Sequence, residues 1–262
     1  MSKDKPIGIF DSGVGGTSIW KEIHHLLPLE HTIYLADSFN APYGEKSPEE
    51  IVRLSIKNTE KLLEMGAKII VVACNTATTN AITHLRTSYS IPFIGIEPAI
   101  KPAALQTRAK CIGILATKGT LSSNLFAKAS DLYSKDNKIV EVVGKGLVEK
   151  IEQGQKDARV VHDMLTELLE PMIQAGIDYL VLGCSHYPYL IPTLKKILPP
   201  HVQIIDSGMA VAKQTRVVLQ SLDLLTSEQQ QIPEFFTNGD PEILADIIPA
   251  PLNSFKVNYL DF

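Results

Sequence analysis

Short runs of apolar residues recur along the chain and alternate with longer segments of mixed polarity. The runs are IGIF (7–10), TIYLA (32–36), KIIVVA (68–73), PFIGI (92–96), CIGILA (111–116), DYLVLG (178–183) and VQII (202–205). Continuous apolar runs of this length are typical of strands that are buried on both faces of a parallel sheet, with helices as the crossovers. The pattern therefore predicts an α/β protein.

Helix signals lie between these runs. The letters SPEE at 47–50 fit an N-cap serine, a proline at the first helical position and the glutamate of a capping box, and Gly66 fits the end of that helix. Further helices are expected from about 157 to 174 and around 241–248. Glutamines and prolines recur in the tail beyond about residue 222, so the other helix and strand boundaries there are not predicted.

The order of motifs repeats weakly within the chain. IGIFDSGVGGTS (7–18) resembles IGILATKGTLSS (112–123), and KIIVVACNTATTNAI (68–82) resembles DYLVLGCSHYPYLI (178–191) in the same order. Chance similarity between strand–turn–helix units is the alternative, but both later units place a cysteine directly after the strand. We therefore expect two pseudo-symmetric lobes, each a mostly parallel sheet flanked by helices, with the active site in the cleft between them.

Composition narrows the class of protein. The 262 residues are 45% hydrophobic and 21% charged, which suits a folded globular chain with two lobes. A net charge of −4 with scattered lysines and arginines argues against nucleic acid as a partner. We found no stretch that approaches a membrane span, and the N-terminal apolar run is too short for a signal peptide, so we expect no membrane partner and a cytoplasmic location.

Polar residues follow most of the predicted strands. These strand ends read Asp11-Ser12, Asp37-Ser38, Cys74-Asn75-Thr76, Glu97, Thr117 and Cys184-Ser185-His186. Ligands of open α/β sheets bind beyond the carboxyl ends of the strands, so these side chains are candidates for a site. The glycines at 13, 15 and 16 permit a tight turn whose amides could bind an anion, although a turn alone is the alternative. Their spacing does not match a dinucleotide or phosphate loop.

Two of the three cysteines stand in matched contexts. Cys74 and Cys184 each follow an apolar run and precede hydrogen-bonding residues. A helix start there would favour thiolate over thiol. A single strand-end cysteine is more often a small buried hydrophobe, but a matched pair indicates chemistry. Cys111 begins an apolar run without polar followers and is expected only to pack, and the cysteine spacing suggests neither a disulfide framework nor a metal site.

Two facing thiols could form a redox disulfide, act as a nucleophile with a spare, or serve as an acid and base pair. The third use explains the surroundings best, because racemisation needs two groups of the same chemistry on opposite faces of one carbon. Asp11 and His186 are candidate proton-handling neighbours, with an N-cap aspartate and a surface histidine as the structural alternatives. Since these motifs contain no arginine, substrate carboxylates would rest on backbone amides, hydroxyls and Asn75.

Taken together, the motifs resemble those of the glutamate racemases, the family that supplies D-glutamate for bacterial peptidoglycan. The resemblance is carried in order by FDSGVGG (10–16), PYGEKS (42–47), ACNTA (73–77), ATKGT (116–120), GCSHYP (183–188) and FFTNGD (235–240). It implies that Cys74 and Cys184 are the catalytic pair, that Asp11 and His186 assist them, and that Glu152 is a further catalytic candidate. The implied substrate contacts are Asp11, Ser12, Pro42, Tyr43, Gly44, Asn75, Thr76, Thr117, Thr120, Ser185 and His186.

The resemblance also implies interconversion of L- and D-glutamate with no cofactor, neither metal nor pyridoxal phosphate, and a homodimer. It implies a discontinuous first lobe of residues 1–97 plus 207–262 and a second lobe of residues 98–206. Ser185 stands where the family usually has threonine and keeps the hydroxyl, whereas the stretch before Glu152 matches poorly. The alternatives are a related racemase of aspartate or another amino acid, and a non-catalytic protein that binds amino acids.

Overall fold

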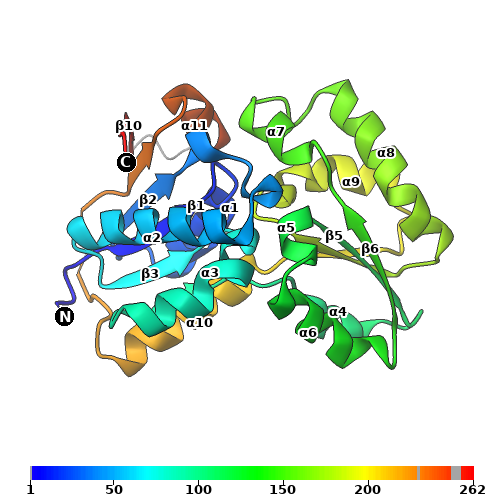
Figure 1. Cartoon of the computed structure of the whole chain (residues 1–262), viewed down its shortest axis with the longest axis horizontal. Helices are drawn as coiled ribbons and strands as arrows, with labels where there is room; N and C mark the ends of the chain where they lie inside the picture. Colours follow the sequence, from blue (N-terminus) through cyan, green and yellow to red (C-terminus); the bar gives the residue numbers. More distant parts are fainter. Residues whose placement is uncertain (1, 229–230, 249–254) are drawn as a thin grey trace.

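A computed structural model describes residues 2–228, 231–248 and 255–262, and contains two parallel sheets flanked by helices (Figure 1). The six-stranded sheet has the order β10-β9-β2-β1-β3-β4, and the four-stranded sheet has the order β6-β5-β7-β8. The strands are β1 (Ile7–Asp11), β2 (Thr32–Ala36), β3 (Ile69–Val72), β4 (Phe93–Gly95), β5 (Cys111–Ala116), β6 (Lys138–Val143), β7 (Tyr179–Gly183), β8 (Gln203–Ile205), β9 (Glu234–Thr237) and β10 (Lys256–Tyr259). The predicted α/β class is confirmed.

Helices cover both sheets. Those of the first sheet's side are α1 (Thr17–Leu26), α2 (Pro48–Glu64), α3 (Asn75–Ser88), α10 (Gly208–Ser221) and α11 (Pro241–Ile247), with short 3₁₀ turns η1 (Ser38–Asn40) and η2 (Tyr43–Glu45). Those of the second are α4 (Ile100–Gln106), α5 (Lys118–Leu121), α6 (Asn124–Ser134), α7 (Leu147–Glu152), α8 (Arg159–Gln174) and α9 (Ile191–Ile197), with the 3₁₀ turn η3 (Tyr187–Leu190). In the described part of the chain, none of these helices is long and apolar enough to cross a membrane.

The two sheets share one strand permutation. In the first sheet β1 lies between β2 and β3, and β4 follows β3; in the second sheet β5 lies between β6 and β7, and β8 follows β7. The two strands that precede Cys74 and Cys184, β3 and β7, therefore occupy equivalent places. This agrees with the expected pseudo-symmetric lobes. The exact lobe boundaries, at 97/98 and 206/207, stay a prediction.

The apolar runs form strands because their side chains are buried on both faces. Ile7 and Ile9 of β1 belong to one hydrophobic core, and Phe10 belongs to another on the opposite face of the sheet. Every pairing in both sheets is parallel. Strands covered on both sides read as continuous apolar runs, which is why the sequence reveals them.

Three strands were not predicted from the sequence: β6, β9 and β10. Strands β6 and β10 lie at sheet edges and are largely exposed or half-buried, so they lack a continuous apolar run. Strand β9 alternates half-buried and buried positions. These patterns are weaker signals than the runs of the central strands.

The predicted helices are found close to their expected ends. Helix α2 begins after Ser47, whose Oγ accepts a hydrogen bond from the Glu50 amide at 3.3 Å, and Gly66 beyond its end has φ of +88°. The capping box is half formed, because the Glu50 carboxylate pairs with Arg53. Helix α8 begins at Arg159 and α11 ends at Ile247, as expected to within two residues.

A buried ion pair anchors the amino end of β3. The Nζ atom of Lys68 lies 2.6 Å from Oε2 of Glu30, and the two side chains are 0% and 2% exposed. Lys68 also donates to the backbone carbonyls of Lys3 and Leu224, so it joins the N-terminal segment to the loop after α10. Removing one partner of such a pair leaves an uncompensated buried charge.

We predict that Lys68→Met lowers the free energy of unfolding by about 3–5 kcal/mol, because Glu30 is left buried without its cation. Urea denaturation followed by circular dichroism measures this change. Lys3→Met is the matched control: it removes the exposed pair of Lys3 with Asp223 and should cost less than about 1 kcal/mol. Equal effects of the two substitutions would contradict the structural role assigned to Lys68.

Candidate active site

The carboxyl ends of the central strands border a small cavity. It is lined by Ser12, Pro42, Tyr43, Gly44, Cys74, Asn75, Thr76, Thr117, Val148, Cys184, Ser185 and His186. All of these residues except Val148 were predicted from the sequence as site residues. Val148 lies in the stretch that matches the family motifs poorly, and a valine in a short helix gives no chemical signal of its own. Asp11, Thr120 and Glu152 lie outside the lining but contact it.

Cys74 directly precedes helix α3 and caps it. Its Sγ accepts a hydrogen bond from the Ala77 amide at 3.4 Å, and its thiol donates to Oγ of Ser12 at 3.7 Å. Burial raises the pKa of the Cys74 thiol well above its usual value, and the nearby Asp11 carboxylate adds to the rise. The Ala77 amide at the helix start favours the thiolate, as expected from the sequence, but burial has the larger effect and favours the thiol.

Cys184 follows β7 but has different surroundings. Its Sγ lies 3.7 Å from Nδ1 of His186. The next element is the 3₁₀ turn η3, and helix α9 begins only at Ile191, so the expected helix start directly after Cys184 is wrong. The equivalent strand ends thus give one thiol a helix amide and the other an imidazole.

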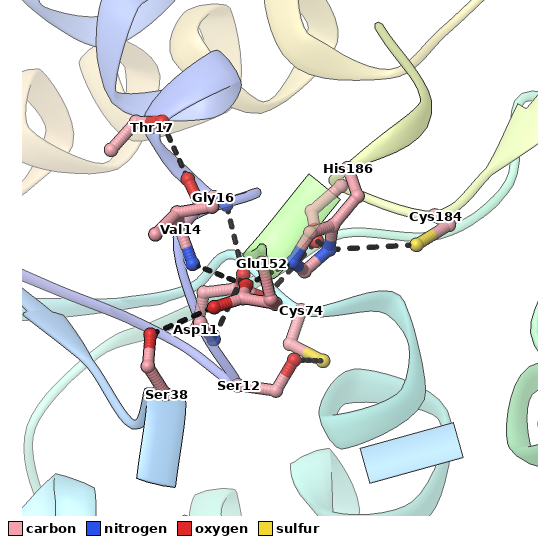
Figure 2. Close-up of polar contacts among 12 residues, drawn as sticks. Asp11, Ser12, Val14, Gly16, Thr17, Ser38, Cys74, Glu152, Cys184 and His186 are labelled. Carbon is pink, nitrogen blue, oxygen red and sulfur yellow. Dashed lines mark hydrogen bonds and ion pairs between the residues drawn. The ribbon is translucent and has the colours of Figure 1, made fainter. Parts of the chain in front are cut away.

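His186 is a buried imidazole held between a thiol and a carboxylate (Figure 2). Its Nε2 lies 2.5 Å from Oε1 of Glu152, and its side chain is only 1% exposed, which excludes the surface-histidine alternative. Burial alone would lower the pKa of His186. The hydrogen bonds with Cys184 and Glu152 outweigh burial and raise the pKa of His186 well above its usual value.

The Glu152 carboxylate reaches from the end of α7 to the first sheet's side of the cavity. Besides His186, it accepts hydrogen bonds from the Val14 amide at 2.7 Å and from Oγ of Ser38 at 2.9 Å. This placement makes Glu152 a direct partner of His186. The geometry is consistent with the family-based expectation that Glu152 assists the chemistry, although that role stays a proposal.

The glycine-rich turn after β1 makes room for these groups. A Cβ on Gly13 would lie 1.9 Å from Oε1 of Glu152, and a Cβ on Gly15 would lie 2.2 Å from Nδ1 of His186. The turn amides do bind anions, but the anions are carboxylates of the protein: Glu152 at Val14, and Asp11 at Gly16.

Asp11 ends β1 and is fully buried. Its carboxylate accepts from the amides of Gly13 at 3.3 Å and Gly16 at 2.9 Å, and from Oγ of Ser185 at 3.1 Å. Burial raises the pKa of Asp11, against the opposing effect of His186. Gly16 holds the N-cap position of α1, so Asp11 is not the N-cap residue of the structural alternative.

Hydroxyl groups line the other wall of the cavity. Oγ1 of Thr76 lies 2.7 Å from Oγ1 of Thr117, and Thr117 donates to Oγ1 of Thr120 at 3.0 Å. Tyr43 donates its hydroxyl to Asp37 and accepts from Asn58, so this hydroxyl is bound within the protein. The wall therefore presents threonine hydroxyls and the backbone around Gly44 to a ligand.

The side-chain amide of Asn75 is a candidate ligand contact. It lines the cavity and is buried, and neither polar atom of its amide has a hydrogen-bond partner among the residues that the structure describes. A buried polar group without a partner costs free energy, so such a group in a cavity indicates a partner that arrives with the ligand.

Two buried thiols line the same cavity. Cys74 and Cys184 are 4% and 6% exposed and come from equivalent strands of different sheets. A ligand bound between them would contact one thiol from each side of the cavity. Within the described residues, no group of three or more His, Cys, Asp or Glu side chains is arranged to hold a metal ion.

Comparison with known proteins gives a consistent result. The family model Asp/Glu/Hydantoin racemase matches residues 8–215. A protein of Herpetosiphon aurantiacus named glutamate racemase is 45% identical over 246 residues, which cover 94% of this chain and 97% of that protein.

Solved structures match over nearly the whole chain. A glutamate racemase isoform of Bacillus anthracis is 33% identical, with a TM-score of 0.88 and coverage of 99% of this chain and 98% of that chain. The Escherichia coli glutamate racemase in complex with L-glutamate and the activator UDP-MurNAc-ala is 33% identical, with a TM-score of 0.85 and coverage of 97% of each chain. The chain therefore belongs to the Asp/Glu/Hydantoin racemase family.

Proposed function

We propose that this chain is a glutamate racemase that moves the α-proton of glutamate between the two faces of the carbon with the thiols of Cys74 and Cys184. The observation that carries the proposal is that both sulfur atoms line one small cavity at equivalent strand ends. The relatives that cover nearly the whole chain bear the name glutamate racemase, which supports glutamate as the substrate.

The reaction balances with the two thiols alone. One cysteine, as thiolate, takes the α-proton and leaves a carbanion stabilised by the substrate carboxylate. The other cysteine, as thiol, donates a proton to the opposite face. Burial raises the pKa of Cys74, which favours its thiol form, and the two cysteines exchange the roles of acid and base when the direction of the reaction is reversed.

Three groups adjoin the pair and act on its protonation. Burial disfavours a charged His186, but its hydrogen bonds with Cys184 and Glu152 raise its pKa, so the ring can pass a proton to Cys184 or stabilise its anion. Burial and the nearby Asp11 raise the pKa of Cys74, which favours the thiol on that side. The two chemically identical side chains thus have unlike surroundings.

Substrate carboxylates are proposed to bind to groups without net charge. The unpaired Asn75 amide, the threonine hydroxyls and the first amides of α3 surround the cavity. Donors placed in advance stabilise the charge that develops on the carboxylate as the proton leaves. We also propose, from the family resemblance alone, that the enzyme supplies D-glutamate for peptidoglycan, is cytoplasmic and forms a homodimer.

We predict that the enzyme without added metal or pyridoxal phosphate converts L-glutamate in heavy water to D-glutamate that carries deuterium at the α-carbon. Chiral chromatography with mass spectrometry measures both inversion and label. Cys74→Ser and Cys184→Ser should each lower kcat about 10²- to 10⁴-fold, the range for loss of an acid or base. Cys111→Ser is the control and should retain activity.

The same assay with aspartate separates the related substrate class, because a shorter chain by one methylene changes binding by about 1–3 kcal/mol. Faster turnover of aspartate than of glutamate would reject the substrate assignment. Absence of turnover with both amino acids would reject glutamate and aspartate as substrates.

We predict that Glu152→Gln moves the alkaline limb of the kcat/KM profile to lower pH. Glu152 helps to raise the pKa of His186, so its loss lowers that pKa and the imidazolium disappears at a lower pH. The pH profile of racemisation measures this shift. Glu167→Gln, at an exposed position of α8, should leave the profile in place, and an unchanged limb in Glu152→Gln would refute the coupling.

We predict that Asn75→Ala raises KM for glutamate about 10-fold or more, since one hydrogen bond to a charged group contributes about 1.5–3 kcal/mol. The melting temperature without substrate should stay close to that of the wild type, because the amide has no partner among the described residues. An unchanged KM would show that Asn75 does not bind the substrate.

A further inference from the structure

Beside the cavity, two glycines and two threonines make a reciprocal contact, here termed the Gly–Thr seam: Gly44, Thr76 and Thr117, which line the cavity, and Gly119, which packs against Thr76. Gly44 and Thr76 come from η2 and α3, whereas Thr117 and Gly119 come from the start of α5. A Cβ on Gly119 would lie 2.8 Å from Cγ2 of Thr76, and a Cβ on Gly44 would lie 2.8 Å from Cβ of Thr117. Each glycine therefore permits a close contact, and any larger residue at its position would force the two facing segments apart.

Hydrogen bonds hold the seam closed. Thr76 and Thr117 share a bond of 2.7 Å between their hydroxyls. Nδ2 of Asn80, one turn along α3 from Thr76, donates to the Gly119 carbonyl at 3.1 Å and to the Thr76 carbonyl at 2.8 Å. Asn80 thus binds backbone on both sides of the contact.

The seam separates the thiols from an outer pocket. Gly44 and Thr117 line both the cavity and a second pocket. The second pocket also includes Lys118 and Lys145, which are exposed, so it lies nearer to solvent. Both sulfur atoms are buried. An amino acid can therefore reach them only while a contact such as the Gly–Thr seam is open.

The glycine at 119 is not explained by the local backbone. Positive φ values among the described glycines occur at 66, 146, 154 and 176, not at 119. Gly119 lies within a helix, where glycine is about 1 kcal/mol less favourable than alanine. The feature that requires glycine is the close approach of Gly44 and Thr76.

We infer that Gly119 is a positioning residue for racemisation: its lack of a side chain lets the two lobes close over the substrate, and Asn80 latches the closed contact. The inference rests on the proposed function, because it names the closure that brings both thiols to the α-carbon. Closure of this kind excludes water and fixes the reacting groups.

The first test is Gly119→Ala. Its Cβ must retreat from Thr76 by several tenths of an ångström, and a misplacement of about 1 Å can cost about 100-fold in rate. We expect kcat to fall about 10- to 100-fold, with a smaller change in KM and no loss of melting temperature, because alanine favours the helix. Activity within twofold of the wild type would overturn the inference.

A second-site change tests the contact itself. Thr76→Ser removes Cγ2, the atom nearest to the new Cβ, and keeps the hydroxyl that bonds to Thr117. The Gly119→Ala substitution should therefore cost several-fold less in a Thr76→Ser background than in the wild type. An equal cost in both backgrounds would show that the loss arises elsewhere and would overturn the inference.

Thiol labelling gives a readout that does not depend on racemisation. Without substrate, Gly119→Ala should increase the rate at which iodoacetamide alkylates Cys74 and Cys184, followed by peptide mass spectrometry. Cys111, a buried cysteine remote from the cavity lining, is the internal control and should keep its rate. Unchanged labelling of the cavity thiols would overturn the inference. Faster labelling in a chain that does not racemise glutamate would instead reject the proposed function alone.

Asn80→Ala tests the latch. Loss of one hydrogen bond across the seam should lower kcat/KM about two- to tenfold. The control is Thr83→Ala, at an exposed position on the next turn of α3, which should change neither kcat/KM nor labelling. Equal results for the two variants would remove Asn80 from the proposal.

Discussion

The site depends on one largely covered carboxylate, that of Glu152, which binds the Val14 amide, the Ser38 hydroxyl and the His186 imidazole together. Removing a carboxylate from water is costly unless it has hydrogen-bond partners, and these partners come from both sides of the cavity. The hydrogen bonds of Glu152 therefore form only when the two sheets meet at the cavity. Together with the contact to Cys184, the bond from Glu152 raises the pKa of His186, so the same carboxylate links the two sheets and acts on the imidazole beside Cys184.

Pseudo-symmetry and asymmetry have separate roles in this protein. The shared strand permutation presents Cys74 and Cys184 to one cavity from equivalent strand ends. Their neighbours differ, because Cys74 faces a helix amide, Ser12 and the field of Asp11, whereas Cys184 faces the imidazole of His186. The proposed racemisation uses matched positions to reach two faces of a carbon, and it needs one thiol to act as acid while the other acts as base.

Close approach explains the glycines around the cavity. Gly13 and Gly15 leave room for Glu152 and His186, while Gly44 and Gly119 leave room for threonines of the facing lobe. In each case the group that a Cβ would meet comes from a distant part of the chain. The glycines thus act on the spacing of the lobes, and only secondarily on the local turn.

Local patterns in the sequence determined much of the fold and most of the cavity lining. Continuous apolar runs revealed the strands buried on both faces, and polar residues at their ends marked much of the lining. Pro42, Tyr43 and Gly44 were expected only from the family resemblance, and Val148 was not predicted. The edge strands β6 and β10 were not predicted, because exposed positions interrupt their apolar pattern. The tertiary structure decided the rest: the raised pKa values of Cys74 and His186, the reach of Glu152 and the reason for Gly119. Burial and cross-lobe distance set these properties, and neither is encoded in the neighbouring residues of the chain.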